Sequence, residues 1–322
     1  MRMESQTADI LQRLLSAPGS TVTTSEREFG RWRRCFYAEA APWPVPVDRA
    51  VIGGFIADCT AYAFAAGYGA ALQALVPGLP GDKIACFCIT EEGGGHPRFI
   101  KTSLAPAGGG AEGGKRWTVT GRKKFITCAA EADLFLVAAS TGPSPDGKNQ
   151  IRMVTVRRET PGIEIQLMRN LRLVPEISHG EVFFREVSVQ AADLLPGDGY
   201  LEYIKPFRTI EDLHVSAAIL GHLFRKARRH AWPREIREAI IGAIVSVRAL
   251  ATSDPGLASV HIAVHEALGR IKELLVRLEP LWDRIGGKEK EDWDRDKVLM
   301  SIADTARTRR IETAWKQYGV LE

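Results

Sequence analysis

The sequence predicts an α+β protein with three domains: a helical domain over residues 1–84, an antiparallel β-barrel over residues 85–198 and a helical bundle over residues 199–322. Two patterns predict this order. Apolar residues recur at helical spacing near both ends of the chain, whereas the middle holds short β-rich runs separated by turn clusters. The length of 322 residues also suits two or three hydrophobic cores better than one.

In the first zone, residues 50–75 form a run of small and apolar side chains that is long enough for one or two buried helices. The PWPVP segment before it predicts a turn, because proline removes backbone donors and restricts its neighbours. Asp58 and the glycines of the run favour close-packed core helices over a membrane span. No stretch of the chain approaches the roughly 20 apolar residues that a membrane helix needs.

Short runs rich in β-forming residues predict the strands of the middle zone. They are separated by segments such as GPSPDG and TPG, which favour turns. Many short strands at close spacing are typical of an antiparallel barrel or sandwich. The predicted strands cover residues 84–90, 116–121, 123–127, 133–140, 151–158, 163–168 and 181–189.

The last zone returns to helical periodicity. Residues 259–282 predict a long amphipathic helix, and residues 292–319 predict another. Pro233 is expected to start a helix, and the SDPG segment is expected to end one. The apolar stripe of the first long helix consists of Val260, Val264, Ala267, Ile271, Leu274 and Leu278.

Charge and cysteine content restrict the class of protein. The net charge of +4 is slight and scattered, so it does not indicate nucleic-acid binding. The five cysteines are an odd number without a metal-type CxxC repeat, and the N-terminus lacks a signal-peptide run. We therefore expect free thiols and a cytoplasmic location. His261 and His265 share a helix face, but the sequence supplies no further ligands, so no metal is expected.

The segment from Phe87 to Pro97, FCITEEGGGHP, joins a predicted buried strand to two carboxylates and three consecutive glycines. Glycines in a row are kept where the backbone bends sharply or where another molecule comes very close. Backbone amides in such a loop bind anions, so an anionic ligand is one interpretation. The other is a core strand that ends in a glycine-rich turn.

Five segments in order resemble the acyl-CoA dehydrogenase family of flavoproteins: FCITEEGGGHP, WTVTGRKKFIT, ADLFLVAAS, TPGIEI and EVFFREVSV with LLPGDG after it. The resemblance extends from about residue 85 to about residue 225. It implies an N-terminal helical domain, a middle β-barrel and a C-terminal four-helix bundle. It also implies FAD held between the barrel and the bundle.

The resemblance further implies which residues bind FAD. The strand backbone from Phe87 to Thr90 would follow the flavin ring, with the peptide groups of Ile89 and Thr90 on its polar edge. Phe125 stands where the family usually has a tryptophan stacked on the flavin, and Thr127 would lie near flavin N5. Gly93 to Gly95 would let backbone amides approach the pyrophosphate, and His96, which stands in place of the family's serine, would donate to it.

The family's usual catalytic glutamate follows a Gly-Gly turn late in the bundle. Gly319 matches the start of that turn and three residues follow it, so we expect that loop to be absent. A minority of the family carries the glutamate ten residues before the glycine of a Leu-Gly pair. Glu211 stands ten residues before Gly221 and is the candidate base; an N-terminal helical carboxylate favoured by the helix dipole is the rival interpretation.

The implied activity is that of an FAD-dependent acyl-CoA dehydrogenase-like oxidoreductase, which removes an α-proton and passes a β-hydride to flavin N5. Its partners would be an acyl-CoA or related thioester, an electron-transfer acceptor, and further copies of itself in a homodimer or homotetramer. Two departures, Glu92 and Asp212, place carboxylates where anions would bind. They leave open a non-catalytic member that binds acyl-CoA or serves as an assembly subunit. A flavin-dependent monooxygenase, which needs no glutamate base, is the third hypothesis.

Overall fold

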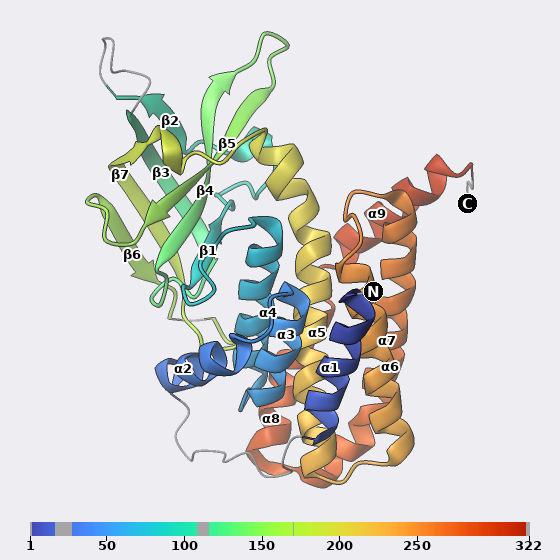
Figure 1. The fold of residues 1–322 in the computed structure, drawn as a ribbon. Helices are drawn as coiled ribbons and strands as arrows, with labels where there is room; N and C mark the ends of the chain where they lie inside the picture. Colours follow the sequence, from blue (N-terminus) through green and yellow to red (C-terminus); the bar gives the residue numbers. More distant parts are fainter. Residues whose placement is uncertain (1, 17–27, 108–115, 170, 320–322) are drawn as a thin grey trace. The chain divides into compact units, whose positions relative to one another are not determined.

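The computed structural model describes residues 2–16, 28–107, 116–169 and 171–319 (Figure 1). Its contacts group the chain into two compact units. The helical unit comprises Met1–Ala74, Arg172–Glu176 and Thr209–Glu322, and the β unit comprises Leu75–Leu171 and Ile177–Arg208. Helices from both ends of the chain therefore share one unit, and the division into three domains over residues 1–84, 85–198 and 199–322 stays a prediction. Helices at both ends and a sheet in the middle confirm the predicted fold class.

The β unit is built on one seven-stranded sheet in the order β1-β4-β2-β3-β7-β6, with β5 paired to β4. Alternating buried and exposed positions along β7 place one of its faces on the core. The strands are β1 (Ala85–Cys88), β2 (Ser103–Pro106), β3 (Arg116–Thr127), β4 (Leu134–Pro143), β5 (Asn149–Arg157), β6 (Ile163–Leu167) and β7 (His179–Gln190).

The sheet differs from the antiparallel barrel of the prediction in its pairing. Strands β1 and β2 both run parallel to β4, while all other neighbours are antiparallel. Strand β2 was not predicted, because it has four residues, one of them a proline. The two strands predicted over 116–127 are one strand, β3, with two irregularities in its pairing to β7. The GGGAEGG segment lies outside the described residues.

The helical unit contains the helices of both ends (Figure 1). Helix α3 packs on α5 backbone to backbone, since a Cβ at Gly54 would lie 1.8 Å from the carbonyl oxygen of Ala218. Helix α4 meets α5 in the same way at Gly67. The helices are α1 (Arg2–Ser16), α2 (Phe29–Ala40), α3 (Pro46–Ile56), α4 (Thr60–Leu75), α5 (Lys205–Arg229), α6 (Arg234–Ala251), α7 (Ala258–Ile285), α8 (Gly287–Asp296) and α9 (Asp304–Gln317).

The predicted amphipathic helix is α7, and five of its six predicted stripe residues are buried. The sixth, Ala267, is half-buried, and Leu268 takes the buried position instead. The second long helix was wrong as one element, because α8 and α9 are separated by a 3-10 turn over Lys297–Met300. Asp296 is the last residue of α8, and its fully buried carboxylate accepts a hydrogen bond from the backbone N–H of Val174 at 2.9 Å. Within the described ranges, no helix is long and apolar enough to cross a membrane.

Candidate functional site

The end of β1 supplies the first predicted cofactor residues. Phe87 is buried, and its ring centroid lies 4.3 Å from that of Phe207. Ile89 and Thr90 follow the strand and are half-buried, so their peptide groups lie where the chain leaves the core. The neighbouring thiol of Cys86 donates to the carbonyl oxygen of Thr127 at 3.0 Å. Burial raises the pKa of Cys86 well above its ordinary value, so this thiol is an inert part of the core.

The loop after β1 is held by a buried ion pair that the sequence analysis did not predict. The Glu91 carboxylate lies 2.7 Å from Lys123 Nζ, and the lysine side chain is fully buried. The same carboxylate accepts hydrogen bonds from the backbone N–H groups of Lys101 and Thr102 at 2.8 Å and 3.0 Å. Burial alone would raise the pKa of Glu91, but Lys123 and these N–H groups outweigh it and lower the pKa.

Phe125 lies in the irregular part of β3, between the paired residues Lys123 and Ile126. Its φ is 57°, a left-handed conformation that is strained for an aromatic residue, and its side chain is 55% exposed. The preceding backbone N–H, that of Lys124, donates to the Thr90 carbonyl oxygen at 2.8 Å. This bond joins the end of β1 to the strand that displays the Phe125 ring.

The glycine-rich loop closes a tight turn, since the backbone groups of Glu91 and Gly94 exchange hydrogen bonds of 3.1 Å and 3.0 Å. Gly94 has a φ of 112°, which favours glycine, and a Cβ at Gly93 would come within 2.4 Å of the Phe99 ring. Gly95 is different, because a Cβ there would make ordinary contact with Ile89 at 3.4 Å. Two of the three glycines are therefore explained by the turn itself.

His96 begins a short 3-10 turn, and its side chain is exposed. The ring nitrogen Nδ1 accepts a hydrogen bond from the backbone N–H of Arg98 at 3.3 Å. With Nδ1 as the acceptor, a neutral imidazole carries its proton on Nε2, so Nε2 is a donor. His96 can therefore donate to an anion, as the serine that it replaces in the family pattern would.

Glu92 does not leave an unpaired negative charge beside this loop. Its carboxylate is 82% exposed and lies 2.8 Å from Lys124 Nζ. The hydrogen bond from Lys124 lowers the pKa of Glu92, which keeps the carboxylate ionised and paired. The objection that Glu92 would repel an anion is therefore weaker than the sequence alone indicated.

Glu211 lies in the helical unit, on α5, and is half-buried. It is the seventh residue of the helix, which is itself preceded by a π-helical turn over Gly199–Ile204. The first turn of α5 contains no acidic residue. A carboxylate at the positive end of the helix dipole therefore does not describe Glu211, and the rival interpretation loses its basis.

Asp212 is a buried carboxylate that is paired with cations, which weakens the argument that it would repel an anion. Its side chain is 4% exposed and forms ion pairs with Arg307 at 2.8 Å and with Arg310 at 2.5 Å. Two guanidinium groups therefore balance one carboxylate, and the sequence could not show this because the arginines stand about a hundred residues away. One turn further along α5, burial lowers the pKa of His214 to about 4, so its imidazole is neutral near pH 7.

The structure thus gathers seven predicted residues at the loop and strand ends of the β unit, and it places the eighth, Glu211, in the helical unit. Among the residues with described side chains, no group of three or more metal-binding side chains occurs.

Comparison with known proteins matches this chain to a family model, to curated relatives and to solved structures. The family model for the middle domain of acyl-CoA dehydrogenase matches residues 86–187. The mitochondrial short/branched chain specific acyl-CoA dehydrogenase of Rattus norvegicus is 31% identical over 127 residues, which are 39% of this chain and 28% of that protein. The chain thus spans less than a third of the length of that relative in the match.

Two solved structures show that the fold likeness extends further. Butyryl-CoA dehydrogenase from Megasphaera elsdenii superposes with a TM-score of 0.67 at 16% identity, covering 98% of both chains. FMN-bound TdsC from Paenibacillus sp. A11-2 superposes with a TM-score of 0.68 at 14% identity, covering 99% of this chain and 96% of that chain. At these identities the likeness concerns the fold alone.

Proposed function

Because this chain belongs to the acyl-CoA dehydrogenase family, we propose that it is an FAD-dependent oxidoreductase that desaturates an acyl thioester. One observation carries the proposal: the hydrogen bond from Lys124 to Thr90 joins the half-buried end of β1 to an exposed, strained Phe125. Backbone strain of this kind is concentrated at ligand-binding and active sites, and among the strained residues Phe125 is an exposed aromatic one.

The residues present fit a flavin. The Phe125 ring offers an exposed aromatic face for stacking, and the half-buried Thr127 offers a hydroxyl on the same strand. The peptide groups of Ile89 and Thr90 would bind the polar edge of the ring. The buried Phe87 would anchor the preceding strand in the core.

The pyrophosphate would take the loop that follows. Gly95 has no side chain to obstruct the approach of a phosphate, and His96 Nε2 is a donor on the exposed side of the turn. The Glu91–Lys123 pair would fix this loop before any ligand arrives, which avoids an ordering cost on binding.

Bound FAD supplies the acceptor for the hydride. Glu211 would remove the proton from the carbon next to the thioester, which requires a carboxylate in a site that excludes bulk water. Its half-buried position on α5 suits that role. Asp212 forms ion pairs with two arginines, and the His214 imidazole is neutral near pH 7. Neither neighbour therefore adds an unpaired charge beside the proposed base.

The remaining parts of the proposal follow from family membership. We propose an acyl-CoA or related thioester as substrate, an electron-transfer protein as acceptor, and a homodimer or homotetramer as the assembly. Five described cysteines are all free thiols, which supports a reducing compartment such as the cytoplasm.

A flavin-dependent monooxygenase is the second candidate, since the same fold holds a flavin, FMN, in the solved structure of TdsC. It would use the same flavin-binding residues but would not need Glu211. The non-catalytic alternative loses two of its arguments, because Glu92 and Asp212 are both paired with cations.

The experiment is flavin loading. The purified protein is incubated with FAD and desalted, and its visible absorbance is recorded. We expect retained flavin bands, and we expect Phe125→Ala to weaken FAD affinity about tenfold, since base–aromatic stacking contributes roughly 1–3 kcal/mol. The matched control is Leu167→Ala, which removes a 51% exposed apolar side chain from β6. A protein that cannot be loaded, or equal affinity in both variants, would contradict this assignment.

A further inference from the structure

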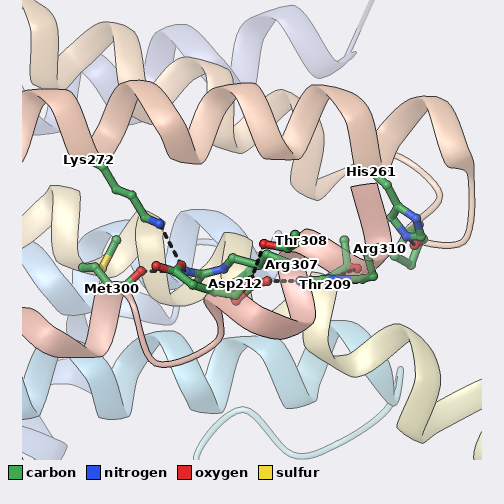
Figure 2. A network of polar contacts seen from close by, with 10 residues as sticks. Thr209, Asp212, His261, Lys272, Met300, Arg307, Thr308 and Arg310 are labelled. Atoms are coloured by element: carbon green, nitrogen blue, oxygen red, sulfur yellow. Dashed lines mark hydrogen bonds and ion pairs between the residues drawn. The ribbon is translucent and has the colours of Figure 1, made fainter. Parts of the chain in front are cut away.

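A pocket of about 180 Å³ opens between α7 and α9 in the helical unit, and none of its lining residues is among those assigned above to the flavin or to proton removal. Figure 2 shows Lys272 reaching from α7 towards Arg307 on α9, with Arg310 and His261 further along the same network. The polar lining consists of His261, His265, Lys272, Arg307, Thr308 and Arg310 together with Asp304.

Positive charge exceeds negative charge around this pocket. Lys272, Arg307 and Arg310 carry three fixed cations. Asp304 bridges Lys272 and Arg307 at 2.7 Å and 2.9 Å, and Asp212 bridges the two arginines from α5. The two carboxylates leave one net positive charge, so the pocket attracts anions and repels metal cations.

The cations also retain unused hydrogen-bond donors. The Nε atoms of Arg307 and Arg310 are buried and have no hydrogen-bond partner among the described residues. Lys272 has three N–H donors and one described partner, the Asp304 carboxylate. These two Nε atoms are closed to a ligand in the pocket, so the donors open to one are the remaining N–H groups of Lys272 and of the partly exposed guanidinium ends.

The pocket has room for a tetrahedral oxyanion, because its volume is many times the roughly 10–15 Å³ that one water needs on the same measure. Donors arrive from two helices, with Lys272 on α7 and both arginines on α9. A phosphate presents oxygens in several directions and suits this arrangement better than a planar carboxylate, and arginine binds phosphate with matched geometry.

We propose that the pocket between α7 and α9 binds a phosphate group, held by Lys272, Arg307 and Arg310. The phosphate comes either as inorganic phosphate or as the end of a phosphate monoester. The proposal does not rest on the flavin assignment, because the pocket lies wholly within the helical unit.

The test measures binding rather than activity. Inorganic phosphate is titrated into the purified protein by calorimetry, with sodium chloride at equal ionic strength as the reference. We expect saturable binding at one site. Lys272→Met should weaken it about tenfold, because a hydrogen bond to a charged group contributes about 1.5–3 kcal/mol.

Lys297→Met is the matched control. Lys297 is 36% exposed and Lys272 is 43% exposed, and each forms an ion pair of less than 3 Å in the helical unit. Because both lysines are substantially exposed, neither variant should unfold, and circular dichroism checks this. Absence of phosphate binding beyond the chloride reference, or equal weakening in both variants, would overturn the proposal.

A second titration with glycerol 3-phosphate identifies the source of the phosphate. Tighter binding of the monoester supports a pocket for the end of a larger molecule, and tighter binding of inorganic phosphate supports a free ion. Failure of both ligands to bind contradicts the phosphate site, whatever the flavin experiment shows.

Discussion

The protein has two pairs of adjacent carboxylates with a comparable arrangement. One pair is Glu91 with Glu92 in the β unit, and the other is Glu211 with Asp212 in the helical unit. In each pair one carboxylate is buried against cations, and its neighbour is less enclosed. The buried member stabilises the local structure. Its neighbour is available either to solvent, as Glu92 is, or to chemistry, as we propose for Glu211.

The difference between the two buried members lies in their cations. Lys123 is fully buried and depends on Glu91 for its charge. Arg307 and Arg310 are 12% and 21% exposed, and Arg307 also contacts Asp304 and the carbonyl oxygen of Met300 (Figure 2). Removing the charge of Glu91, whose one cationic partner is fully buried, should therefore cost more stability than removing the charge of Asp212, which is shared between two partly exposed arginines.

The largest expected effect concerns Glu211, the proposed catalytic base. In the FAD-loaded protein, Glu211→Gln should slow bleaching of the flavin absorbance by butyryl-CoA about 10²- to 10⁴-fold, since that is the usual contribution of a general base. FAD affinity should stay unchanged. The measurement is stopped-flow absorbance under single-turnover conditions.

Glu92→Gln is the control for this variant, because it removes an exposed carboxylate from the other pair. It should bleach at the rate of the unaltered protein. An unchanged rate in Glu211→Gln would remove Glu211 from the mechanism, whereas absence of bleaching in the unaltered FAD-loaded protein would favour the monooxygenase.

The second prediction concerns the buried member in the β unit. Glu91→Gln leaves the Lys123 ammonium buried without a counter-charge, so the free energy of unfolding should fall by about 3–5 kcal/mol. Urea unfolding measures this change. The double variant with Lys123→Met should recover much of the loss, because it removes the uncompensated charge. A loss below about 0.5 kcal/mol in Glu91→Gln, as expected for a surface position, would refute a structural role.

Acid stability gives a second measurement of the same pair. The pKa of Glu91 is lowered in the folded state. Its ionised form therefore contributes stability above the ordinary carboxyl pKa of 4.5, and that contribution is lost as the pH falls below this value. Unfolding of the unaltered protein should become easier on acidification below pH 4.5. Glu91→Gln should show a shallower dependence over the same range.

The sequence predicted those parts of the fold that depend on periodicity. The stripe of α7 and strands β4 to β7 were correct, because burial repeats locally along each of them. Strand β2 and the break between α8 and α9 could not be predicted in this way. Both involve partners distant in sequence: β2 pairs with β3, and Asp296 at the end of α8 contacts Val174.

In the candidate site, too, local features were predicted and contacts between distant residues were not. The segment from Phe87 to His96 was found from its own composition and family resemblance. The pairing of Glu91 with Lys123 was missed, although EE and KK pairs 32 residues apart were visible, because neither pair indicates which of its members is buried. The pairing of Asp212 was missed for a similar reason, since the charges that balance it come from α9.

The smallest expected effect concerns Asp212 itself. Asp212→Asn keeps the shape of the side chain and part of its hydrogen bonding to the two arginines, and those arginines are partly exposed. The free energy of unfolding should therefore fall by only about 1–3 kcal/mol, less than for Glu91→Gln. Urea unfolding of both variants under one condition decides the order. If Asp212→Asn lowers the free energy of unfolding more than Glu91→Gln does, then the partial exposure of the arginines and the additional partners of Arg307 do not reduce the loss of stability. The contrast between the two buried carboxylates would then be wrong.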